Sequence, residues 1–68
     1  MYLEFKDTFH YHDGHLERWH NAVDKLNDYI KQHPNECVEV LFYNTVYLPD
    51  KHFSQTCILA HAVESIKR

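Results

Sequence analysis

The 68-residue chain has one glycine, two prolines and two cysteines, and neither its apolar nor its charged residues form long runs. A single glycine excludes a glycine-rich phosphate loop, and the G-x-S-x-G turn of serine hydrolases is absent. No segment approaches the about 18 consecutive apolar residues of a membrane span, and the first residues lack the layout of a signal peptide. We therefore expect a cytoplasmic protein in which Cys37 and Cys57 are free thiols.

Charge of either sign is scattered along the chain. Ten acidic residues and seven Lys and Arg give a formal net charge of −3. Phosphate backbones and anionic lipid select clustered basic residues, so neither nucleic acid nor a membrane is an expected partner. The apolar content of 44% indicates an ordered domain, but 68 residues are close to the lower limit for a self-sufficient core. Stabilisation by a partner is therefore plausible on size alone.

The first half of the chain changes from a period of two residues to a helical period. Alternation predicts a strand over residues 2–12, in which Asp7 interrupts the apolar face. Helical spacing then predicts a helix over residues 14–33, with Asp13 as its N-cap and Pro34 enforcing its end. The residues expected on the buried face of this helix are Leu16, Trp19, Val23, Leu26 and Ile30.

The second half follows the same scheme. Alternation predicts a strand over residues 37–48, and Asp50 is the expected N-cap of a helix over residues 51–67. The expected buried stripe of that helix is Leu59, Ala62, Val63 and Ile66, with Phe53 near its start. A shift of 37 positions aligns the D-x-H of one half with that of the other. An internal duplication explains this match, and so does the use of similar strand-to-helix junctions in unrelated segments.

These elements predict one α+β domain over residues 1–68, a small βαβα fold with two long strands and two helices packed on one sheet face. A right-handed crossover would set the two strands parallel. The alternative is a ββα arrangement in each half, with hairpin turns at residues 7–8 and 44–45. We favour the long strands, because β-branched threonine disfavours the positive φ that such turns require.

Two strands with helices on one side would leave free edges and an aromatic outer face. Tyrosine is favoured at interfaces, so this face is a predicted docking surface, although tyrosine hydroxyls can also simply face water. A homodimer that extends the sheet would cover both features. The predicted protein-binding residues are Tyr2, His10, Leu41, Tyr43 and Tyr47.

The seven histidines support a second hypothesis, a transition-metal site. Parallel strands would bring both strand-to-helix junctions to one sheet edge, where imidazole and carboxylate groups could bind zinc. The candidate ligands are His12, His15, His52 and Asp50. The competing interpretation is that the aspartates cap helices and the histidines are surface residues.

No complete catalytic constellation is present. Cys57, His61 and Glu64 would share one face of a helix over residues 51–67, but one helix supplies neither oxyanion donors nor a substrate cleft. The sequence therefore predicts a non-enzymatic protein-binding module without a cofactor. Small stand-alone chains of this kind are typical of stoichiometric inhibitors and adaptors, including antitoxins and bacteriophage-encoded inhibitors, and the target stays unidentified.

Overall fold

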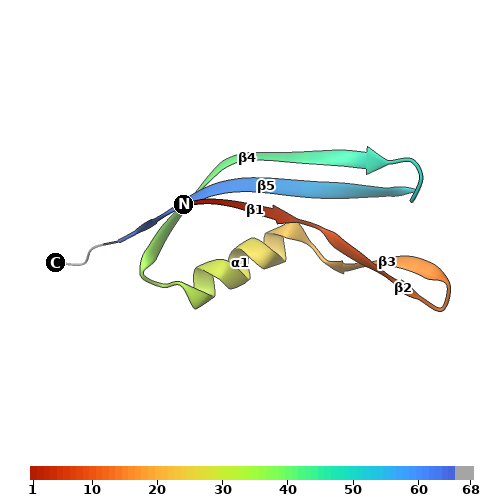
Figure 1. Ribbon diagram of the computed structural model, residues 1–68, viewed down its shortest axis with the longest axis horizontal. Coiled ribbons are helices and arrows are strands. Elements are labelled where there is room, and N and C mark those ends of the chain that lie inside the picture. Colours follow the sequence, from red (N-terminus) through yellow and green to blue (C-terminus); the bar gives the residue numbers. More distant parts are fainter. Residues whose placement is uncertain (66–68) are drawn as a thin grey trace.

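A computed structural model describes residues 1–65 as a mostly β domain with one helix in that range (Figure 1). The elements are β1 Tyr2–Lys6, β2 Thr8–His12, β3 His15–His20, α1 Ala22–Gln32, β4 Glu36–Leu48 and β5 Phe53–Glu64. Strands β1, β5 and β4 form an antiparallel sheet in that order, whereas β2 and β3 form a separate antiparallel hairpin. The predicted βαβα fold with two helices and parallel strands is therefore wrong.

Two hairpins project from the part of the molecule that the helix covers (Figure 1). One is formed by the long strands β4 and β5, and the other by β2 and β3. The molecule is elongated and thin, with principal extents of 53 × 22 × 13 Å. No helix within residues 1–65 has the length and apolarity needed to cross a membrane. A thin sheet covered on one side by a single helix leaves much of its apolar surface open.

The predicted helix over residues 14–33 is wrong for residues 14–21, because Asp13 and Gly14 form a hairpin turn. Both residues have positive φ, 50° and 77°, and His12 pairs directly with His15 across them. Asp-Gly is favoured in two-residue hairpin loops, because both positions require positive φ. The chain therefore returns as β3 instead of entering a helix.

Helix α1 begins nine residues after Asp13, at Ala22. Its N-cap is Asn21, whose side-chain oxygen accepts a hydrogen bond from the Asp24 N–H at 2.8 Å. The helix ends at Gln32, shortly before Pro34, as proline requires. The predicted end of the helix is thus close to the observed one, and the predicted start is not.

The predicted strand over residues 2–12 divides into β1 and β2 at Asp7, which is 4% exposed. One carboxylate oxygen accepts the Ala22 N–H at 2.6 Å, and the other accepts the Thr56 N–H at 2.9 Å. The Arg18 guanidinium lies 3.4 Å from the second oxygen. Asp7 therefore joins the first residue of α1, strand β5 and strand β3 at one buried point.

The predicted helix over residues 51–67 is wrong, since residues 53–64 form strand β5; residues 66 and 67 lie outside the described part of the chain. Every second residue in the middle of β5 is buried: Ile58, Ala60 and Ala62 lie on the face of the sheet that α1 covers. Leu59 and Val63, expected in a helical stripe with Ala62, lie on the opposite face. As the central strand, β5 makes backbone hydrogen bonds with β1 on one edge and with β4 on the other. A helix at this position would make neither set.

The repeated D-x-H does not mark two helix starts. In the first copy Asp13 lies in the β2–β3 turn, and in the second copy Asp50 lies in the loop from Pro49 to His52 that joins β4 to β5. In that loop the Lys51 N–H donates to the Leu48 carbonyl at 3.1 Å, and His52 has a φ of 56°. Both copies therefore belong to hairpin turns, and the two halves of the chain do not share one fold.

The core is small and lies between α1 and one face of the three-stranded sheet. Its buried centre consists of small and medium side chains, and Leu3, Leu26, Tyr29 and Val38 pack around it. The face of α1 that packs on the sheet carries Ala22, Leu26 and Tyr29, so Val23 and Ile30 are exposed instead of buried. Trp19 lies on β3 and is 59% exposed. The buried core residues are Phe5, Ala22, Ile58 and Ala60.

Candidate interaction surface on strand β4

Strand β4 is an edge strand of 13 residues. One edge pairs with β5, and among the described residues no strand pairs with the other edge. Its charged residues are Glu36 and Glu39, both at its beginning. Six apolar or aromatic side chains that follow are 47–69% exposed: Val40, Leu41, Phe42, Tyr43, Val46 and Tyr47. A long, apolar, unprotected edge is the feature that folded proteins normally cover or interrupt with charge.

A β-bulge at Leu41 decides which side chains share a face. Val40 pairs with Ala60 and Phe42 with Leu59, so Leu41 is the extra residue between two consecutive partners on β5. One inserted residue exchanges the two faces for every residue that follows it. The simple alternation used to interpret the sequence is therefore correct up to Val40 and inverted after it.

The sheet has a helix face, on which α1 packs, and an outer face. Tyr43 pairs with the buried Ile58 and therefore lies on the helix face, as does Tyr47, which pairs with Ser54. Tyr2 lies on the outer face, where its ring is 4.7 Å from that of His61. The tyrosines predicted to share one docking face are thus divided between both faces.

The other predicted docking residues occupy further positions. Leu41 is the bulge residue of β4, and His10 lies on the separate β2–β3 hairpin. There its Nε2 atom is 3.4 Å from a Glu17 carboxylate oxygen, and its ring is 4.4 Å from that of Trp19. The five predicted residues therefore do not form one continuous patch, although β4 contributes three of them.

Both faces of the sheet carry apolar groups beyond the reach of the helix. On the helix face, α1 packs over β1 and β5, and Tyr43 and Tyr47 remain exposed beside it on β4. On the outer face, Phe42 and Leu59 form a direct cross-strand pair with partial exposure of both side chains. Besides its free edge, β4 thus carries more exposed large apolar residues than any other element within residues 1–65.

The candidate metal ligands divide between two turns. His12 and His15 face each other at the β2–β3 turn, whereas Asp50 and His52 lie in the β4–β5 loop at the end of a different hairpin (Figure 1). The parallel strands that were expected to bring these turns together are not formed. Within residues 1–65, no group of three or more His, Cys, Asp or Glu side chains is arranged to hold a metal ion.

Strand β5 also separates the residues that would have shared a helix face. Cys57 and His61 lie four residues apart on the outer face, which corresponds to about 13 Å along a strand. Cys37 pairs with Val63, six residues along β5 from Cys57, so about 20 Å separates the two thiols. Both cysteines are free, and no disulfide can form between them without rearrangement of the sheet.

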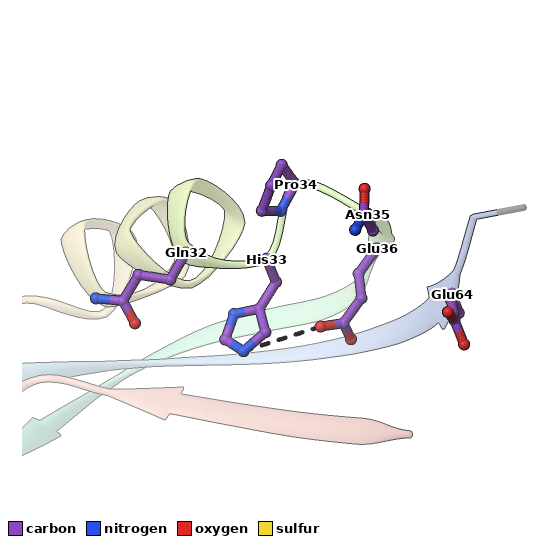
Figure 2. Close-up of a pocket in the computed structure, with 6 residues that line it drawn as sticks. All are labelled: Gln32, His33, Pro34, Asn35, Glu36 and Glu64. Atoms are coloured by element: carbon purple, nitrogen blue, oxygen red, sulfur yellow. Dashed lines mark ion pairs between the residues drawn. The ribbon is translucent and has the colours of Figure 1, made fainter. Parts of the chain in front are cut away.

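A shallow pocket lies where the helix C-terminus meets the beginning of β4 (Figure 2). The Tyr29 hydroxyl donates to a Glu36 carboxylate oxygen at 2.8 Å, and the Tyr29 and His33 rings stack at 4.0 Å. Figure 2 shows the His33 ring directed toward Glu36, with 3.9 Å between nitrogen and oxygen, while Glu64 lies apart on β5. These contacts attach the C-terminal end of the helix to the beginning of β4.

Tyr29 provides a pH-dependent contribution to stability. Desolvation raises the pKa of its phenol above the ordinary value of 10.0, and the hydrogen bond to Glu36 and the charge of that carboxylate raise it further. Because the folded state favours the protonated phenol, this contribution is complete below the pKa of the unfolded chain and is lost as the pH rises through the higher folded pKa.

We therefore expect the stability difference between the wild type and Tyr29→Phe to stay constant up to about pH 10 and to shrink at higher pH, since phenylalanine cannot ionise. Urea unfolding followed by circular dichroism at successive pH values measures this difference. Tyr11→Phe, at an exposed position on β2, is the matched control. A difference for Tyr29→Phe that stays constant throughout the alkaline range would contradict the assigned role of Glu36.

Sequence reasoning missed Asp7 and Arg18 as a linked pair. Arg18 lies over the Phe9 and Phe53 rings and donates to the Ser54 carbonyl at 2.8 Å, so it connects the two hairpins. The available signal was an aspartate on the apolar face of a strand, since a buried carboxylate requires hydrogen-bond donors. Its donors come from residues 15 and 49 positions away, which no local pattern identifies.

Comparison of the chain with protein-family models, with curated proteins and with solved structures finds no match.

Proposed function

We propose that this chain is a non-enzymatic protein-binding module, a stoichiometric inhibitor or adaptor that engages its partner through strand β4. The observation that carries the proposal is the free edge of β4, whose segment from Val40 to Leu48 has no charged residue and is mostly exposed. A strand of the partner would form hydrogen bonds with the unpaired backbone N–H and C=O groups of this edge. Pockets on the partner beside that strand would bind the tyrosine and phenylalanine side chains of β4.

The charge pattern favours protein over nucleic acid as the partner. The net charge is −3, and the charged residues on β4 are glutamates. An apolar edge bordered by acids matches a partner strand with apolar side chains and a basic end, and it would repel a phosphate backbone. A cytoplasmic location is part of this proposal, because reducing conditions suit the free thiols of Cys37 and Cys57.

We expect the double variant Tyr43→Ser with Tyr47→Ser to lose partner binding while remaining folded. Both side chains are more than half exposed, so their removal costs little core packing but takes two aromatic anchors from the surface. Affinity purification from the native host with wild-type and variant baits, followed by mass spectrometry, identifies proteins that depend on these residues. Binding of a purified candidate is then measured directly, with a loss of at least about tenfold expected.

Tyr11→Ser is the matched control, because Tyr11 is a similarly exposed strand tyrosine on the other hairpin. It should retain the same partner as the wild type. Equal recovery of every foreign protein by the wild type and the double variant would contradict a binding role for β4.

A further inference from the structure

The longest uninterrupted part of the free edge has seven residues. From Phe42 to Leu48, β4 pairs with consecutive residues of β5 without a register shift. The bulge at Leu41 interrupts the ladder on one side, and Pro49, which has no N–H to donate, follows on the other. The segment F-Y-N-T-V-Y-L between these limits contains no charge. It is therefore the part of β4 that can accept another strand over its whole length.

We propose that this segment pairs antiparallel with the same segment of a second copy, about a two-fold axis at Thr45. This inference rests on the proposed function, since it takes β4 as the interaction strand and identifies a partner for it. The two three-stranded sheets would join into one continuous sheet of six strands, with the two β4 strands at its centre. Both free β4 edges would then be covered.

The sequence of the segment suits this register. With Thr45 opposite itself, Tyr43 of one copy lies opposite Tyr47 of the other, so two aromatic pairs form on the helix face. On the outer face Phe42 lies opposite Leu48, again an apolar pair. Aromatic pairs of this kind are among the more favourable cross-strand contacts.

Charge also favours antiparallel pairing. Glu36 and Glu39 precede the segment, and an antiparallel arrangement carries them to opposite ends of the joined strands. A parallel arrangement would place the glutamates of the two copies side by side, where like charges destabilise a sheet. A second copy thus fits the segment without introducing a charge conflict.

The surface available is sufficient for a weak to moderate dimer. Phe42, Tyr43, Val46 and Tyr47 are 47–69% exposed in each copy. At on the order of 100 Å² of exposed area per side chain, these residues and the paired backbone edges together approach the about 1,000 Å² expected of a specific interface. A foreign protein that adds a strand to β4 would compete with the second copy for this edge.

Register-specific charge pairs test the inference. Tyr43→Lys alone and Tyr47→Glu alone should each weaken self-association by at least about tenfold, because each places charges against tyrosine on the apolar strand pair. A mixture of the two variants should restore the dimer, since Lys at position 43 of one chain then faces Glu at position 47 of the other. Sedimentation equilibrium measures the dimer dissociation constant of the wild type, of each variant and of the mixture.

Cysteine cross-linking tests the position of the two-fold axis independently. In a chain with Cys37→Ser and Cys57→Ser, the Thr45→Cys variant should form a disulfide-linked dimer on mild oxidation, because directly opposite Cβ atoms lie about 4.5–5.5 Å apart. Ser54→Cys is the control: it lies on the neighbouring strand β5, and two further strand spacings would separate its copies. Preferential cross-linking at position 45 together with rescue by the charge pair supports the proposed register.

A wild-type chain that sediments as a monomer overturns the inference, and so does a dimer that is unaffected by changes at positions 43 and 47. Neither result tests whether β4 binds a different protein, because that binding is measured separately by affinity purification. Conversely, a chain that forms this dimer but captures no foreign protein retains the inference about self-pairing and loses the inhibitor or adaptor role.

Discussion

Replacement of Asp7 by alanine is expected to unfold most of the domain at room temperature. The change removes both carboxylate oxygens from a buried site and leaves the N–H groups of Ala22 and Thr56 without their acceptors. It also removes the ion pair with Arg18. The Ala22 N–H is buried and the Thr56 N–H is partly buried. Each donor left without an acceptor costs about 1–3 kcal/mol, so a total loss of about 3–5 kcal/mol is expected. A core of this size supplies a net stability of about the same magnitude.

Urea unfolding followed by far-ultraviolet circular dichroism measures this loss. Asp7→Asn should have an intermediate effect, because asparagine retains one oxygen acceptor but presents an amide nitrogen to the second donor. Asp28→Ala is the matched control: Asp28 is exposed on α1, where removal of a carboxylate should change stability by no more than about 0.5 kcal/mol. A chain with Asp7→Ala that is as stable as the Asp28→Ala control would contradict the buried role of Asp7.

Alanine substitutions at two adjacent residues of β5 are expected to differ strongly in their effects. Ile58 is 4% exposed in the core beneath α1, whereas Leu59 lies on the outer face with more than a third of its surface exposed. Ile58→Ala should lower the free energy of unfolding by about 3 kcal/mol, through lost burial and a residual cavity. Leu59→Ala should cost less than about 1 kcal/mol, since much of its side chain already contacts water.

The same pair distinguishes strand from helix in the second half of the chain. A helix over residues 51–67 with the predicted stripe would bury Leu59 and expose Ile58, which reverses the order of the two effects. Urea unfolding of both variants at a protein concentration that keeps the chain monomeric isolates this comparison from any change in association. A larger loss for Leu59→Ala than for Ile58→Ala would contradict the β5 assignment.

The candidate surface was only partly predictable. Tyr43 and Tyr47 were expected to be exposed, and both are. Simple alternation along residues 37–48 would place Phe42 and Val46 on the same face as Val40, yet both lie on the other face beyond the bulge at Leu41 and are partially exposed. The bulge reverses the faces within one strand, and no residue type at that point of the sequence requires it.

Some features follow from residues that are close in sequence. Strict alternation of side chains is a local property, and β4 accordingly covers the strand expected over residues 37–48. Pro34 ends a helix wherever that helix begins, because it lacks an N–H and clashes with the preceding turn. Asp13 and Gly14 also carried a local signal for a hairpin, but Asp13 suits a helix N-cap equally well by composition.

Tertiary structure alone decided the remainder. Residues 53–64 present apolar side chains at spacings compatible with either a helix or a strand, and their position between β1 and β4 makes the strand the better hydrogen-bonded state. In the sequence, Asp7 is only a polar residue on the apolar face of a predicted strand. The N–H groups that it accepts from, and Arg18, are brought next to it only by the tertiary structure. Local sequence thus determined the alternation over residues 37–48 and, through Pro34, the residue near which the helix stops. Non-local hydrogen bonds determined which alternating segment became the central strand and which of its faces was buried.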